Sequence, residues 1–147
     1  MKQSSNQEEN LKTTALLPKN KSRVGEGGLR TKGDYKKSYH GRPLISIITV
    51  VFNNERYLED TIMSVLNQSY DNVEYVIIDG GSSDGTLDII RKYEDEIDYW
   101  VSEEDSGIYD AMNKGIDLVM GDWVNFLNSS DTIEKNAYTL VLDCLLN

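Results

Sequence analysis

The 147-residue chain contains a single cysteine, Cys144, and a single histidine, His40. One cysteine excludes an intramolecular disulfide and favours a reducing, cytoplasmic setting. Because Cys144 stands beside Leu140, Val141 and Leu145, we expect it to be a small buried apolar side chain. His40 has no second histidine or cysteine near it in the sequence, which disfavours a zinc-type metal site.

Long apolar runs are also absent. The longest uncharged apolar stretch, PLISIITVVF at residues 43–52, is about half the length of a membrane-spanning helix. The first 42 residues contain no apolar segment of the kind found in secretory signals. We therefore expect a soluble chain that has no membrane anchor of its own.

Positive charge is scarce outside the N-terminal region. Residues 1–42 hold ten of the fifteen Lys and Arg residues but four of the twenty-five Asp and Glu residues, so this segment carries a net charge of +6 and the remainder −16. The segment is polar and has no sustained apolar period, which predicts a disordered basic tail and a domain boundary near Pro43. No nucleic-acid motif accompanies its charges, so a solvated tail is favoured over an arm that binds nucleic acid or anionic lipid.

From residue 43 onward, short apolar segments alternate with amphipathic ones. The predicted strands are rich in β-branched residues and cover residues 44–52, 73–79, 98–103 and 122–128. Each is followed by a segment with apolar residues at helical spacing. In the last helix the predicted buried stripe is Ile133, Ala137, Leu140, Val141 and Cys144. This order predicts an α/β domain over residues 43–147, Rossmann-like, with a largely parallel sheet and helices on both faces.

The loops that follow the predicted strands are acidic. In a parallel sheet these loops share the carboxyl edge, where open α/β sheets bind ligands. With almost no cation nearby in the sequence, they carry Glu55, Asp79, Asp84, Glu103, Glu104, Asp105 and Asp131. Such an edge repels phosphate unless a divalent cation lies between them, so the pattern indicates Mg²⁺ or Mn²⁺.

The stretch VIIDGGSSDGT at residues 76–86 suits a nucleoside. Asp79 ends a buried strand and can accept a hydrogen bond from a base N–H or a ribose hydroxyl. Gly80 and Gly81 let the backbone turn sharply beside a ligand. Asp84 is interpreted as the cap of the next helix. The loop after the first strand lacks the glycines of a dinucleotide-binding motif, which disfavours a dinucleotide fold of the usual kind.

Three stretches together resemble family 2 glycosyltransferases. They are SIITVVFNNERYLEDTIMSVLNQSYDNVEYVIIDGGSSDGT, DSGIYDAMNKGI and GDWVNFLNSSD, which match in order and spacing from about Pro43 to Asp131. The resemblance implies the nucleotide-sugar-binding half of a GT-A fold. It also implies inverting transfer of a sugar from a nucleotide-diphosphate donor to a saccharide or lipid-linked acceptor, in polysaccharide or glycolipid synthesis. Such acceptors are compatible with peripheral association at the cytoplasmic face of a membrane.

The resemblance also assigns residues. Phe52 matches the aromatic beside the base and Asp79 matches the acid that bonds the base. The acid that follows the aromatic–Asn pair falls at Asn54 or Glu55, and we assign Glu55. The predicted donor-binding set is Phe52, Asn53, Glu55, Asp79, Gly80 and Lys114. The alternative functions are core packing for Phe52, a helix cap for Asn53, and a solvated position for Lys114.

The family's metal motif is altered in this chain. The family has two or three acids there, whereas this chain has Asn128, Ser129, Ser130 and Asp131. Asp131 matches the last acid and is assigned to Mg²⁺ or Mn²⁺, and a single carboxylate predicts weak binding. The alternative is that Asp131 caps the last helix.

The resemblance places the general base in the half that follows the metal motif, so no residue here is assigned to it. The sequence stops at Asn147, and we interpret the chain as truncated. A non-catalytic nucleotide-binding remnant or subunit is the alternative. A phosphorylation-receiver domain shares the alternating pattern, but it needs acids after the first strand, where TVVFNNE supplies them poorly.

Overall fold

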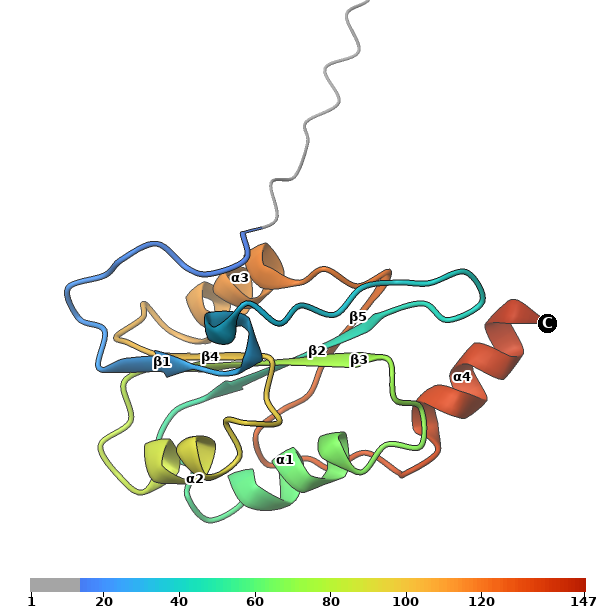
Figure 1. Ribbon diagram of the computed structural model, residues 1–147. Coiled ribbons are helices and arrows are strands. Elements are labelled where there is room, and N and C mark those ends of the chain that lie inside the picture. The colour runs from blue at the N-terminus through green and yellow to red at the C-terminus, as the bar shows by residue number, and fades with distance from the viewer. Residues whose placement is uncertain (1–13) are drawn as a thin grey trace, which may run out of the picture.

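The computed structural model describes residues 14–147, and the first 13 residues of the predicted tail lie outside the described part. A five-stranded sheet forms the centre of the molecule (Figure 1). In chain order its strands are β1 (Gly25–Gly27), β2 (Ile45–Val51), β3 (Val73–Asp79), β4 (Tyr99–Ser102) and β5 (Trp123–Phe126). In space the order is β1-β4-β3-β2-β5. All neighbours are parallel except β1 and β4, which confirms the predicted largely parallel sheet.

Helices cover both faces of the sheet, as predicted. They are α1 (Leu58–Leu66), α2 (Thr86–Lys92), α3 (Ile108–Leu118) and α4 (Ala137–Leu146), with a short 3-10 helix η1 (Leu29–Lys32). α1 and α2 lie on one face and α3 lies on the other (Figure 1). Successive strand residues point to opposite faces, so Ile77 packs on the α1 side whereas Val76 and Ile78 pack on the α3 side. None of the helices over residues 14–147 has the length and apolar character that a membrane crossing requires.

The last helix does not bury its predicted stripe. α4 contributes Tyr138 and Leu142 to the core, whereas Leu140 and Val141 are at least half exposed. α4 lies at one end of the sheet, so only one side of it meets the core (Figure 1). The two buried residues are four positions apart and share that side, which leaves Leu140, Val141 and Cys144 of the predicted stripe exposed. Ile133, which precedes α4, packs against the core as predicted.

The thiol of Cys144 is exposed, and the prediction of a buried side chain is wrong. We expect the native protein to release one equivalent of chromophore from a water-soluble aromatic disulfide reagent without denaturant, because the thiol is accessible. The absorbance of the released thiolate measures this, and Cys144→Ser is the blank. A reaction that begins only in guanidinium would contradict the exposed position.

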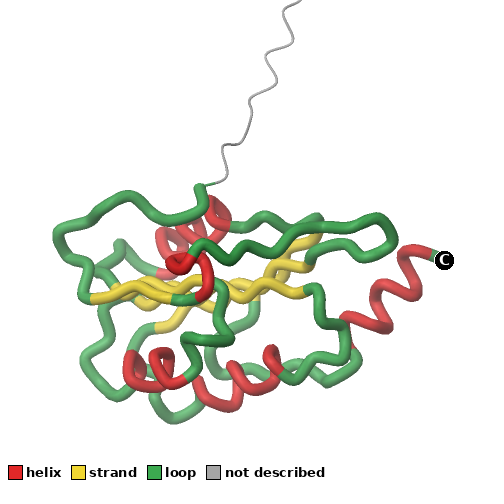
Figure 2. Tube along the Cα trace, in the orientation of Figure 1, coloured by secondary structure: helices red, strands yellow, loops and turns green. Residues whose placement is uncertain are grey.

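The segment of residues 14–42, called here the N-terminal strap, is ordered. β1 pairs antiparallel with β4, and the N–H groups of Leu29 and Arg30 donate to the carbonyls of Ile97 and Asp98. The strap runs along the α3 side of the sheet (Figure 2). The predicted disorder of residues 1–42 is therefore wrong for the described residues 14–42. By pairing with β4, the strap also covers a strand that would otherwise be a free sheet edge.

The basic side chains of the strap hold it in place, and one of its glycines allows a close approach to the sheet. Five ion pairs join it to acids of the remaining chain: Arg23–Glu103, Arg30–Glu74, Lys32–Asp95, Lys36–Asp98 and Arg42–Asp71. Gly27 lies so close to Trp100 that a Cβ on it would be 2.6 Å from the indole nitrogen. The basic segment thus compensates the acidic one, and its glycine allows a close approach of strand to ring.

Candidate functional site

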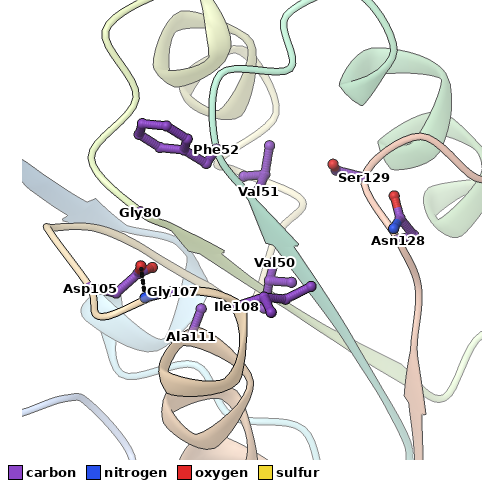
Figure 3. Close-up of a pocket in the computed structure, with 10 residues that line it drawn as sticks. All are labelled: Val50, Val51, Phe52, Gly80, Asp105, Gly107, Ile108, Ala111, Asn128 and Ser129. Atoms are coloured by element: carbon purple, nitrogen blue, oxygen red, sulfur yellow. Dashed lines mark hydrogen bonds between the residues drawn. The ribbon is translucent and has the colours of Figure 1, made fainter.

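A pocket of about 450 Å³ opens at the carboxyl edge of the sheet. β2 has β3 on one side and β5 on the other, so the strand order reverses there, at the place where open α/β sheets bind ligands. The pocket is lined by residues from several elements: Val50, Val51, Phe52, Gly80, Asp105, Gly107, Ile108, Ala111, Asn128 and Ser129 (Figure 3).

The pocket combines an apolar wall with a few polar groups. Ile108 at the start of α3 points toward Val50 of β2 (Figure 3). Asn128 and Ser129 lie on the opposite side, in the chain that follows β5 (Figure 3). Phe52 lies at the end of β2, and its side chain is 63% exposed. A largely apolar cavity with an exposed ring and few polar groups suits a ligand with a planar apolar part and several hydroxyls.

Gly80 and Asp105 bring two loops together in the pocket wall. A Cβ on Gly80 would lie 2.8 Å from Oδ2 of Asp105, so glycine permits this approach. The N–H of Gly107 donates to Oδ1 of Asp105 at 3.0 Å, which orients the carboxylate (Figure 3). Gly80 was predicted as a site residue and lines the pocket. Asp105 was predicted only as one of the acids at the carboxyl edge, with no role of its own. Its position just before a predicted helix is the sequence feature that would have assigned it to the site.

Asn53 and Glu55 join the loops after β2 and β3. Oδ1 of Asn53 accepts the N–H of Ser83 at 2.8 Å, and Oε2 of Glu55 accepts the N–H of Gly85 at 2.9 Å. Asn53 has a φ of 47°, in the left-handed region that asparagine tolerates better than most residues. Neither residue lines the pocket, so their predicted contact with a nucleotide stays a prediction.

Asp84 was predicted as the cap of α2; the N-cap residue is Gly85, and Asp84 lies one residue before it and accepts the N–H of the first helical residue. Its Oδ1 accepts the N–H of Thr86 at 2.9 Å, and its Oδ2 accepts the N–H of Glu55 at 3.2 Å. Desolvation alone would raise the pKa of Asp84, but these bonds and the Thr86 side chain stabilise its charged form and hold the pKa below its usual value. Because the folded-state pKa is the lower one, the cap's contribution to stability is present at neutral pH and is lost below about pH 4.

Asp79 lies behind the pocket and is fully buried. Its Oδ2 accepts the N–H of Ser82 at 3.0 Å and the hydroxyl of Ser102 at 2.6 Å, and its Oδ1 accepts the hydroxyl of Ser82. The carboxylate therefore ties the loop after β3 to the end of β4. Its predicted hydrogen bond to a base stays a prediction, since Asp79 is not among the lining residues.

Lys114 contacts acids of its own chain. Its Nζ lies 3.1 Å from Oε1 of Glu103 and 3.8 Å from Oδ2 of Asp110. Glu103 is 3% exposed and also lies 2.8 Å from Nε of Arg23. The expectation of an edge with almost no cation is therefore wrong, because Arg23 reaches it from the strap. Lys114 is not a lining residue, and its contact with a diphosphate stays a prediction.

The described residues do not form a metal site by themselves. Over residues 14–147, no three Asp, Glu, His or Cys side chains gather closely enough to hold a metal ion. Asp131 is exposed, and its backbone carbonyl accepts the hydroxyl of Thr61 at 2.6 Å. α4 begins six residues later, at Ala137, so Asp131 does not cap it. A single exposed carboxylate does not fit a resident Mg²⁺ or Mn²⁺ ion.

Asn54 has a role that was not predicted from the sequence. Its backbone N–H donates to Oγ1 of Thr86, and its Nδ2 donates to the hydroxyls of Ser129 and Ser130, each at 2.9 Å. Asn54 thereby joins the chain segments that follow β2, β3 and β5 around the pocket. Ser130, which stands where an acid was expected, is an acceptor in this network.

Comparison with known proteins identifies the family. The model of Glycosyl transferase family 2 matches residues 46–145. The chain belongs to this family. A similar protein, the putative teichuronic acid biosynthesis glycosyltransferase TuaG of Bacillus subtilis, is 39% identical over 108 residues, which cover 71% of this chain and 43% of the relative. The chain therefore spans less than half the length of this curated relative. The family match begins after the strap.

Solved structures of similar proteins support the GT-A fold. Staphylococcus aureus TarS 1–349 in complex with UDP-GlcNAc has a TM-score of 0.59 and 26% identity, covering 69% of this chain and 30% of TarS. The mannosyltransferase PcManGT of Pyrobaculum calidifontis, in complex with GDP-Man and Mn²⁺, has a TM-score of 0.58 and 25% identity. This match covers 66% of this chain and 30% of PcManGT. The family 2 chain thus has the predicted α/β fold of the nucleotide-sugar-binding half.

Proposed function

We propose that this chain is the donor-binding part of a glycosyltransferase, which moves a sugar from a nucleotide-diphosphate donor to an acceptor hydroxyl with inversion. The observation that carries the proposal is the pocket at the reversal of strand order, with Phe52 exposed at its mouth. Family membership and the UDP-GlcNAc and GDP-Man bound to two similar structures support it.

Each wall of the pocket has a task in this proposal. The exposed ring of Phe52 stacks on the base, since aromatic rings are sequence-tolerant platforms for nucleobases. The carboxylate of Asp105, which is held by Gly107, accepts hydrogen bonds from hydroxyls of the ribose or the sugar. Asn128 and Ser129 offer neutral polar groups on the opposite wall. None of the described residues is assigned as the general base that deprotonates the acceptor.

The proposal also includes a divalent cation. A similar structure holds Mn²⁺ together with GDP-Man, and the acidic surroundings here favour charge compensation of a diphosphate. Since Asp131 is the one acid matched to the metal motif, we propose that Mg²⁺ or Mn²⁺ binding depends on the diphosphate being present. We further propose polysaccharide or glycolipid synthesis in the cytoplasm, at the membrane face where a lipid-linked acceptor would lie.

Calorimetric titration with a panel of UDP and GDP sugars in Mn²⁺ tests donor binding. We expect saturable binding of at least one sugar nucleotide, weakened about 5–150-fold by Phe52→Ala, because stacking on an aromatic ring contributes about 1–3 kcal/mol. Tyr109→Ala is the matched control, because Tyr109 is 78% exposed and does not line the pocket. If no sugar nucleotide in the panel binds, the proposal is overturned.

A non-catalytic nucleotide-binding subunit is the second candidate. This candidate is favoured by the absence of acids at Ser129 and Ser130, whose hydroxyls accept hydrogen bonds from Nδ2 of Asn54. An assay of donor hydrolysis or sugar transfer by the purified chain separates the two candidates, since turnover would exclude the second.

A further inference from the structure

We propose that the N-terminal strap positions one wall of the pocket, with Arg23 acting through Glu103 on the loop of residues 103–107. The inference rests on the proposed function for its effect on ligand binding, although its structural part can be tested without a ligand. The strap lies before the residues that the family model matches, which begin at residue 46, so the family match does not include this contribution.

Arg23 is fixed from both sides. Its Nη2 donates to the carbonyl of Pro18 at 2.8 Å, and its Nη1 lies 3.3 Å from Oε2 of Glu26, so the strap itself orients the guanidinium. Its Nε donates to Oε2 of Glu103 at 2.8 Å. The Arg23 side chain is 11% exposed, so this pair is shielded from the screening that weakens surface ion pairs.

Glu103 connects the strap to the pocket wall. Its backbone N–H donates to the carbonyl of Asp79 at 3.1 Å, and its second carboxylate oxygen meets Lys114 at 3.1 Å. Asp105, which lines the pocket, follows two residues later in the same loop. Removing Arg23 leaves the nearly buried carboxylate of Glu103 with Lys114 as its cation. Because its negative charge is then incompletely compensated, the carboxylate is driven toward solvent. Movement of Glu103 toward solvent would carry the loop away from Gly80.

The strap contacts the same wall at a second point, through Glu26, which also pairs with Arg23. The hydroxyl of Tyr99 donates to Oε2 of Glu26 at 2.6 Å and accepts the N–H of Leu17 at 3.3 Å. Leu17 packs against the core cluster that contains Ala111, and Val50 packs against that cluster too. Ala111 and Val50 both line the pocket. Polar and apolar contacts of the strap therefore converge on the α3 side of the site.

Arg23 is a positioning residue, because it touches neither the pocket nor a reacting group. This role predicts a local effect that differs from a general loss of strap contacts. Lys32→Gln supplies the matched control. Lys32 belongs to the same strap and pairs with Asp95 at 2.8 Å, but both side chains are more than half exposed and η1 lies away from the pocket lining.

Hydrogen exchange on the full chain without nucleotide measures the position of the loop. We expect Arg23→Gln to speed exchange of the amides of residues 103–108 about tenfold, while the amides of β2 and β3 keep the parental rates. Lys32→Gln should leave the loop unchanged. Equal acceleration throughout the protein would show a merely structural role and overturn the proposal, as would parental exchange in the loop of Arg23→Gln.

Titration with the sugar nucleotide that the parent binds gives the functional readout. We expect about tenfold weaker binding by Arg23→Gln and parental binding by Lys32→Gln, because displacement of a binding wall by about 1 Å is costly. In a Glu103→Gln background the same Arg23 change should have little further effect, since no buried charge remains to be compensated. Equal weakening by Arg23→Gln in both backgrounds would overturn the route through Glu103. A parent that binds no sugar nucleotide, combined with local loosening in Arg23→Gln, would overturn the proposed function while supporting the positional role.

Discussion

Replacing Arg30 with methionine is expected to lower the free energy of unfolding by about 3–5 kcal/mol, since it leaves a buried carboxylate without its cation. Nη2 of Arg30 lies 2.8 Å from Oε2 of Glu74, and each side chain is 1% exposed. Nη1 also donates to the carbonyl of Leu118 at 2.6 Å, so the change removes a cap from the end of α3. Thermal unfolding should shift downward by about 6–20 °C for a domain of this size.

Two further variants make this test specific. Arg30→Met combined with Glu74→Gln should recover a large part of the loss, because an amide replaces the uncompensated charge and its oxygen can still accept from Ser46 and Met120. Lys32→Met removes an exposed strap ion pair and should leave the melting temperature at the parental value. Equal effects of Arg30→Met and Lys32→Met would mean that the strap does not bury its arginine.

Replacing Gly80 with valine is expected to weaken binding of the sugar nucleotide about 5–150-fold, because overpacking costs about 1–3 kcal/mol. A Cβ at this position already lies 2.8 Å from Oδ2 of Asp105, and the branched side chain would extend into the pocket. Gly80 is not among the glycines with positive φ, so the backbone accepts a side chain and the variant should fold. Calorimetric titration beside a thermal melt separates binding from folding.

Ser83→Val is the control for this substitution. Ser83 belongs to the same loop and is exposed, and it uses its backbone N–H rather than its hydroxyl in the bond to Asn53. It should bind the sugar nucleotide as the parent does. If Gly80→Val binds the sugar nucleotide with parental affinity, the loop after β3 does not belong to the donor site.

The order of strands and helices was predictable because hydrophobic periodicity is local. The strand predicted at residues 73–79 coincides with β3, and the helical segment expected after the third predicted strand is present as α3. The same locality explains why Phe52 and Gly80, which were predicted as site residues, line the pocket. Each follows directly from a strand end, and parallel strands bring their carboxyl ends to one edge.

The failures concern side chains whose partners are distant in sequence. Glu103 looked like a free rim acid, but its arginine is 80 residues away, at position 23. The strap was predicted to be disordered because it is polar and has no apolar period, yet its Gly27 packs against Trp100. α4 was predicted to bury Leu140, which requires an element on that side of the helix, and the described residues place none over it. Composition cannot distinguish a solvated charge from one that has a partner.

An α/β sheet with an acidic carboxyl edge follows from local sequence alone, since the alternation of apolar segments and the residues at strand ends are properties of neighbouring positions. Which acids are buried and paired, which line the pocket, and that residues 14–42 belong to the folded domain became known only from the three-dimensional arrangement. An ion pair, a close glycine contact or a shared pocket wall depends on segments up to about a hundred residues apart, and no local pattern encodes their meeting.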